Sequence, residues 1–104
     1  MRSPSGEQHE LVLGDQTAVV TGVGAGLRSY AVRGRPVLDG YGADEMCASG
    51  RGQTLMPWPN RIADGRYTFG GEEHQLAINE RRTGSAIHGL VRWVAWSLAD
   101  RDER

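Results

Sequence analysis

This sequence has no lysine, a single cysteine and no long hydrophobic run. Without lysine, it has no residue for a Schiff base or for a phosphate-binding loop that depends on one. Cys47 is alone, which excludes an internal disulfide and a zinc site built from several cysteines. No window approaches a membrane span, and residues 1–10 lack the apolar core of a secretory signal. We therefore expect a cytoplasmic protein that does not contact a membrane.

The charged residues are nearly balanced, because twelve basic residues, all arginine, oppose thirteen acidic ones and leave a net charge of -1 at pH 7. Neither sign gathers along a visible stripe, which argues against nucleic acid as a partner. Fifteen glycines are about twice the average share, and without a Gly-x-y period they indicate many tight turns.

The hydrophobic pattern predicts short strands separated by turn residues. These segments fit strands by alternation or by a short apolar run: 9–13, 17–21, 27–33, 36–40, 66–69 and 73–78. Gly14-Asp15, between 9–13 and 17–21, predicts a first hairpin. The clearest hairpin is centred on Gly70-Gly71, a dipeptide that accepts the positive backbone angles of a tight turn. Residues 40–52 have no clear period and are expected to form a loop.

Residues 91–98 are apolar on both faces, which predicts a strand covered on two sides, with a helix as the main alternative. No window longer than ten residues holds a helical stripe, and the turns recur at the spacing of a sandwich. We predict an all-β fold, an antiparallel β-sandwich. Residues 1–6 are expected to be a flexible N-terminus, 7–98 the folded part and 99–104 a charged tail.

Two motifs invite a ligand-binding interpretation that the residues do not support. "GVGAG" at 22–26 would need a third glycine where Leu27 stands, so it is interpreted as a turn and not as a nucleotide site. The three histidines fit no metal motif by spacing, and no metal site is predicted. His9 and His74 are expected on the solvated surface. His88 is flanked by apolar residues in "AIHGL", where a polar ring needs a partner, so on these residues alone it is expected to be a satisfied core histidine.

The segment "PWPNRIADGRYTFGG", 57–71, carries an Asn60-Arg61 pair behind two prolines, although neither residue is needed to form a turn. Trp58 is a candidate pocket wall, because a pyranose ring packs well on an aromatic face. Core packing is the expected role of the other two tryptophans, Trp93 and Trp96.

Residues 52–80, "GQTLMPWPNRIADGRYTFGGEEHQLAINE", followed by 86–98, "AIHGLVRWVAWSL", resemble the aldose 1-epimerase (galactose mutarotase) family. The match includes the Asn-Arg-Ile run, the x-Gly-x-Tyr/Phe hairpin, the Leu-x-x-Asn step and the His-Gly pair at its usual separation. A looser similarity extends back to about Leu11. The resemblance implies a large antiparallel β-sandwich that interconverts the α and β anomers of hexoses such as glucose or galactose, with no cofactor.

In that chemistry a base removes the proton of the C1 hydroxyl and an acid protonates the ring oxygen, so that the ring opens and recloses on either face. By resemblance, Arg61 and His88 match residues that line the family's sugar pocket, and Asn60 supports the loop or contacts a hydroxyl. Pro57 and Pro59 would stiffen the backbone that carries Arg61.

The resemblance implies that the acid histidine and the base glutamate come from later in the family's chain, so no catalytic residue is expected among these 104. The expected unit is then the N-terminal part of a mutarotase-like sandwich, and its unpaired strand edges predict a homodimer. The main alternative is a non-catalytic carbohydrate-binding module. A structural β domain and an epimerase for phosphorylated hexoses, with Arg81, Arg82 and Arg92 as the basic residues, also stay open.

Overall fold

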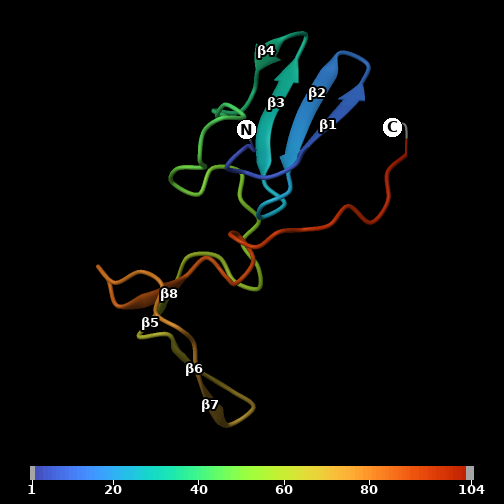
Figure 1. The fold of residues 1–104 in the computed structure, drawn as a ribbon. Helices are drawn as coiled ribbons and strands as arrows, with labels where there is room; N and C mark the ends of the chain where they lie inside the picture. The colour runs from blue at the N-terminus through green and yellow to red at the C-terminus, as the bar shows by residue number, and fades with distance from the viewer. Residues whose placement is uncertain (1, 103–104) are drawn as a thin grey trace. The chain divides into compact units, whose positions relative to one another are not determined.

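The structure is a computed structural model that describes residues 2–102, and this part of the chain forms strands, turns and loops without a helix (Figure 1). The strands are β1 (Gln8–Leu13), β2 (Gln16–Thr21), β3 (Leu27–Val32), β4 (Arg35–Pro36), β5 (Arg61–Ala63), β6 (Arg66–Phe69), β7 (Glu72–Gln75) and β8 (Ser85–Ile87). Every pair of named strands is antiparallel. The predicted all-β class is confirmed.

The chain divides into two compact units, Met1–Thr54 with Arg92–Arg104 and Leu55–Val91. In the first unit the strand order is β1-β2-β3-β4 (Figure 1). In the second unit β5 pairs with β8 and β6 pairs with β7. Each unit therefore has its own hydrogen-bonded strands.

The first unit confirms the predicted hairpin, because β1 and β2 pair across the turn at Gly14-Asp15. The loop that follows β2 is organised by Thr21, which is 1% exposed. Its hydroxyl donates to Val23 O at 3.0 Å and accepts the Gly26 N–H at 3.2 Å. "GVGAG" is thus a turn between β2 and β3, as predicted. Of the brief strand expected at 36–40, only Pro36 is in a strand, as the second residue of β4.

The prediction of a regular strand at 91–98, covered on two sides, is wrong, and so is its helical alternative. Residues 94–96 lie against the loop 22–24 through an isolated bridge and two backbone hydrogen bonds. Trp93 is 50% exposed and Leu98 55%. A segment that is apolar on both faces is buried only if other parts of the chain pack on both faces. Here the loop 22–24 forms backbone hydrogen bonds along one edge of residues 94–96 and leaves Trp93 and Leu98 exposed.

The second unit is built around β8, whose residues Ser85, Ala86 and Ile87 are all buried. The hairpin β6–β7 forms across Gly70-Gly71 as predicted. His74 is not a free surface side chain, since its ring stacks on Tyr67 with centroids 5.0 Å apart. His9 is also half-buried, and its Nε2 lies 3.5 Å from a carboxylate oxygen of Glu7.

Little apolar surface is buried. Within residues 2–102 the buried hydrophobic side chains are Ala86 and Ile87, while Phe69 is 76% exposed and Leu90 61%. The homodimer through strand edges stays a prediction. The same residues contain no helix that could span a membrane.

Candidate functional site

All four residues predicted for the sugar pocket, Trp58, Asn60, Arg61 and His88, lie in the second unit. Arg61 begins β5 and His88 directly follows β8. The register pairs Arg61 with Ile87 and Ala63 with Ser85, so the next residues outward are Asn60 and His88. Two segments that are far apart in sequence therefore present their polar residues at one end of a short ribbon.

Asn60 and His88 hold each other at this end of the ribbon. The His88 N–H donates to Asn60 O at 2.9 Å, and the Asn60 N–H donates to His88 Nδ1 at 3.0 Å. Both residues have a left-handed backbone, with φ of 61° in each case. Non-glycine residues seldom adopt this conformation, and they concentrate at functional sites when they do. The strand alternation thus stops at both positions.

The contact with Asn60 selects the tautomer of His88. A backbone N–H can only donate, so Nδ1 must accept and carries no proton. In a neutral imidazole the proton then resides on Nε2, which becomes the donor of the ring. The side chain is half-buried. His88 can therefore offer an N–H to a ligand oxygen while its other nitrogen anchors the ring to the backbone.

The backbone of Met56 explains why the residue after His88 is a glycine. Met56 and Gly89 form a parallel bridge, and the next amide, that of Leu90, donates to Met56 O at 2.8 Å. A Cβ at position 89 would lie 2.2 Å from Met56 O, and φ is 75°. Only glycine combines this close approach with this backbone angle. The His-Gly pair is therefore a packing requirement as well as a motif.

Asn79 fixes the end of β8 from the other side. Its Oδ1 accepts the Ile87 N–H at 2.6 Å, and its Nδ2 donates to Ile87 O at 2.9 Å. The side chain of Asn79 thus pairs with both the N–H and the C=O of the buried residue Ile87. Because Ile87 is held in this way, the next residue, His88, leaves the strand in a defined direction.

Arg61 binds a carboxylate of the same unit. Its Nε lies 2.5 Å from Glu80 Oε1 and its Nη2 lies 3.2 Å from Glu80 Oε2, which is a two-pronged ion pair. The hydroxyl of Thr83 also donates to Glu80 Oε1. The pair holds the pKa of Glu80 down at about 2, mainly through the hydrogen bond from Arg61, and it raises the pKa of Arg61. Both groups therefore stay charged at neutral pH.

We expect this pair to weaken only in strong acid. The groups that face the Glu80 carboxylate are Arg61, Thr83 and Arg82, and they act to lower its pKa from 4.5 to about 2. The stabilisation is therefore fully present above about pH 4.5 and is lost as the pH falls toward 2. A carboxyl-carbon NMR titration of Glu80 measures this directly. In Arg61→Ala the titration midpoint should rise, and an unchanged midpoint would contradict the pair.

Trp58 is partly buried, and its indole Nε1 is shielded from solvent without a hydrogen-bond partner among the described residues. Burying this N–H without an acceptor costs free energy. Its role as the wall of a sugar pocket stays a prediction.

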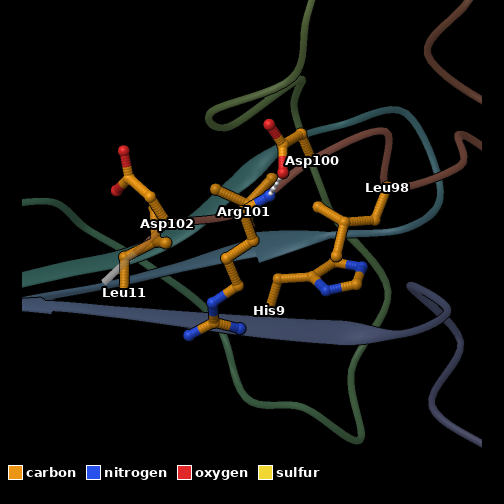
Figure 2. Close-up of a pocket in the computed structure, with 7 residues that line it drawn as sticks. His9, Leu11, Leu98, Asp100, Arg101 and Asp102 are labelled. Atoms are coloured by element: carbon orange, nitrogen blue, oxygen red, sulfur yellow. Dashed lines mark hydrogen bonds between the residues drawn. The ribbon is translucent and has the colours of Figure 1, made fainter. Parts of the chain in front are cut away.

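A hollow of about 380 Å³ lies in the first unit, between β1 and residues 98–102. His9 and Leu98 line it, and the side chain of Arg101 extends toward β1 (Figure 2). The guanidinium of Arg101 donates to the carbonyl oxygen of Glu10. None of the four predicted residues contributes to this hollow. Among residues 2–102 there is also no group of three or more histidine, cysteine, aspartate or glutamate side chains arranged to hold a metal ion.

Of the predicted residues, the structure joins Asn60 to His88 by hydrogen bonds. Arg61, the next residue after Asn60, forms an ion pair with Glu80 instead. Sequence reasoning missed Glu80 and gave no role to Asn79, although the Leu-x-x-Asn step contains it. No local pattern could have found Glu80, because it lies nineteen positions from Arg61 in the sequence.

Comparison with known proteins bears on the family and the fold of the chain. The profile of the family described as aldose 1-epimerase matches residues 9–103. The uncharacterized protein YihR of Escherichia coli K12 is 41% identical over 96 residues, which are 92% of this chain and 31% of YihR.

Two solved structures share the fold. A candidate aldose 1-epimerase from Escherichia coli K12 has a TM-score of 0.76 at 20% identity, over 93% of this chain and 33% of its own. A galactose mutarotase-like protein from Clostridium acetobutylicum has a TM-score of 0.60 at 23% identity, over 80% of this chain and 30% of its own. The chain thus spans about a third of the length of these relatives.

Proposed function

The chain belongs to the aldose 1-epimerase family, and we propose that its second unit binds a free hexose such as glucose or galactose, with Arg61 and His88 as the orienting residues. The observation that carries this proposal is the tied Asn60–His88 pair beside Arg61. It leaves the His88 Nε2–H as a donor that is already oriented before a ligand arrives.

The donor set suits a sugar. A hexose presents hydroxyl and ring oxygens at fixed spacing, and these oxygens accept hydrogen bonds. Arg61 supplies a planar guanidinium, of which only the Nε and Nη2 edge is used by Glu80. Its side chain is 42% exposed, so the remaining N–H bonds are accessible to a ligand.

We propose further that this chain supplies orientation and not proton transfer. Anomer exchange needs a base at the C1 hydroxyl and an acid at the ring oxygen. Arg61 stays protonated and His88 uses Nδ1 to accept the Asn60 N–H, so neither is arranged to act as the base. The acid and the base of an active epimerase would then come from outside these 104 residues.

The test is a titration of the chain with D-galactose and D-glucose, followed by amide NMR. We expect the amides of residues 60, 61 and 88 to shift with sugar concentration, and Arg61→Ala or His88→Ala to weaken binding by about tenfold or more, the value of one or two lost hydrogen bonds to a ligand. Polarimetry of freshly dissolved glucose should show no acceleration by the chain.

The matched control is Arg66→Ala, which removes an exposed arginine from β6 in the same unit. The Nε of Arg66 donates to Gln75 Oε1 on the neighbouring strand β7. Its binding should equal that of the unaltered chain. Sugar binding that is untouched by both Arg61→Ala and His88→Ala would refute the proposed site. Sugar binding without any polarimetric effect, also when the chain is fused to the part of a family member that it does not match, would identify a carbohydrate-binding module instead.

A further inference from the structure

Glu80 is fixed to the site by its backbone as well as by its side chain. Its N–H donates to Ser85 O at 3.1 Å, and the Ser85 N–H donates to Glu80 O at 3.1 Å. Ser85 begins the buried strand β8. The position of Glu80 is therefore set by the same strand that leads to His88. Residues 81–84, which lie between Glu80 and Ser85, form a turn that these two hydrogen bonds close.

The turn also returns a side chain to the carboxylate. The Gly84 N–H donates to Arg81 O at 3.2 Å, and Gly84 has a positive φ of 66°. This reversal brings the hydroxyl of Thr83 to Glu80 Oε1, the oxygen that also accepts from Arg61 Nε. The side chain of Glu80 is 20% exposed, against 42% for that of Arg61. Glu80 is thus the inner partner and the guanidinium the outer one.

We propose that Glu80 is the positioning residue of Arg61, holding the Nε and Nη2 edge of the guanidinium so that its other N–H bonds face a sugar hydroxyl. The ligand in this proposal rests on the proposed function, whereas the clamp rests on the contacts alone. An arginine that is held before binding loses less conformational freedom when it binds. Glu80 acts through Arg61 and does not itself contact the sugar.

The experiment uses the full chain with Glu80→Gln, Glu80→Asp and Thr83→Val, and with Glu73→Gln, an exposed carboxylate of β7, as the matched control for lost charge. Two quantities are measured: the affinity for D-galactose, and the hydrogen exchange rate of the Arg61 Nε–H by NMR. We expect Glu80→Gln to speed this exchange and to weaken the affinity by about tenfold, as for a lost charged hydrogen bond. Glu73→Gln should change neither quantity.

The other two variants separate geometry from charge and from folding. Glu80→Asp keeps the charge but shortens the reach, so we expect it to behave like Glu80→Gln. Thr83→Val keeps the size of the side chain and removes only the hydroxyl, so a small change in the same direction is expected even if the Glu80 variants unfold.

Wild-type affinity in Glu80→Gln would overturn the proposal. Wild-type affinity in Glu80→Asp, with weakened affinity in Glu80→Gln, would also overturn it, because the negative charge and not the two-pronged contact would then determine the affinity. If the unaltered chain binds no hexose, the proposed function fails. Faster Arg61 exchange in Glu80→Gln would then still support the clamp, and unchanged exchange would overturn it as well.

Discussion

Gly89→Ala is expected to destabilise the second unit by about 3 kcal/mol or more, an effect at the large end for a single methyl group. The added Cβ would lie 2.2 Å from Met56 O and 2.4 Å from its carbonyl carbon. Both are backbone atoms, so neither can move aside as the end of a flexible side chain can. The positive φ of 75° adds about 1 kcal/mol of strain for alanine. Hydrogen exchange of the Leu90 amide, which donates to Met56 O, measures the loss.

Gly70→Ala is the matched control. Gly70 also has a positive φ, 61°, but a Cβ there would have no atom within 4 Å. This variant should therefore show the strain of about 1 kcal/mol without the clash. Equal stability of the two variants would refute the packing explanation of the His-Gly pair.

Asn79→Ala should also have a large effect, because it removes both hydrogen-bond partners of the Ile87 backbone at once. Ile87 is 6% exposed, so its N–H and C=O would be left without partners in a buried place. Each such group costs about 1–3 kcal/mol, which predicts a total of about 2–6 kcal/mol for the two. Urea unfolding of the unaltered and altered chains measures the difference.

Asn79→Asp tests the mechanism with the same side-chain size. It keeps an oxygen to accept the Ile87 N–H and replaces the donor to Ile87 O by a second oxygen, so at least half of the loss is expected, or about 1–3 kcal/mol. The amides of Asn60 and His88 should shift in both variants, since β8 leads directly to His88. An Asn79→Ala chain as stable as the original would show that water replaces both contacts.

The strands that carry the site are the ones that sequence reasoning did not find. β5 and β8 have three residues each, and an alternating pattern cannot be recognised over so short a run. The hairpins around Gly14-Asp15 and Gly70-Gly71 were found, because a turn dipeptide and its flanking strands lie together in sequence. The partner of β5 lies more than twenty residues away, and the intervening hairpin hides the pairing.

The error at 91–98 has the same origin. Two apolar faces indicate that a segment could be covered on two sides, but they do not specify what covers it. The structure pairs residues 94–96 with the glycine loop at 22–24 and leaves Trp93 and Leu98 exposed. Periodicity describes one segment, whereas burial depends on its neighbours.

The amino-acid sequence by itself determined the all-β class, the glycine turns and the family, since backbone preferences and motif residues act locally. It also marked Arg61 and His88 as the residues to examine. Only the tertiary structure decided that Glu80 holds the guanidinium and that the Asn60 amide selects the tautomer of His88. These contacts join residues nineteen and twenty-eight positions apart. Such pairs form only when strand pairing has closed the chain between them, and no local preference encodes that closure.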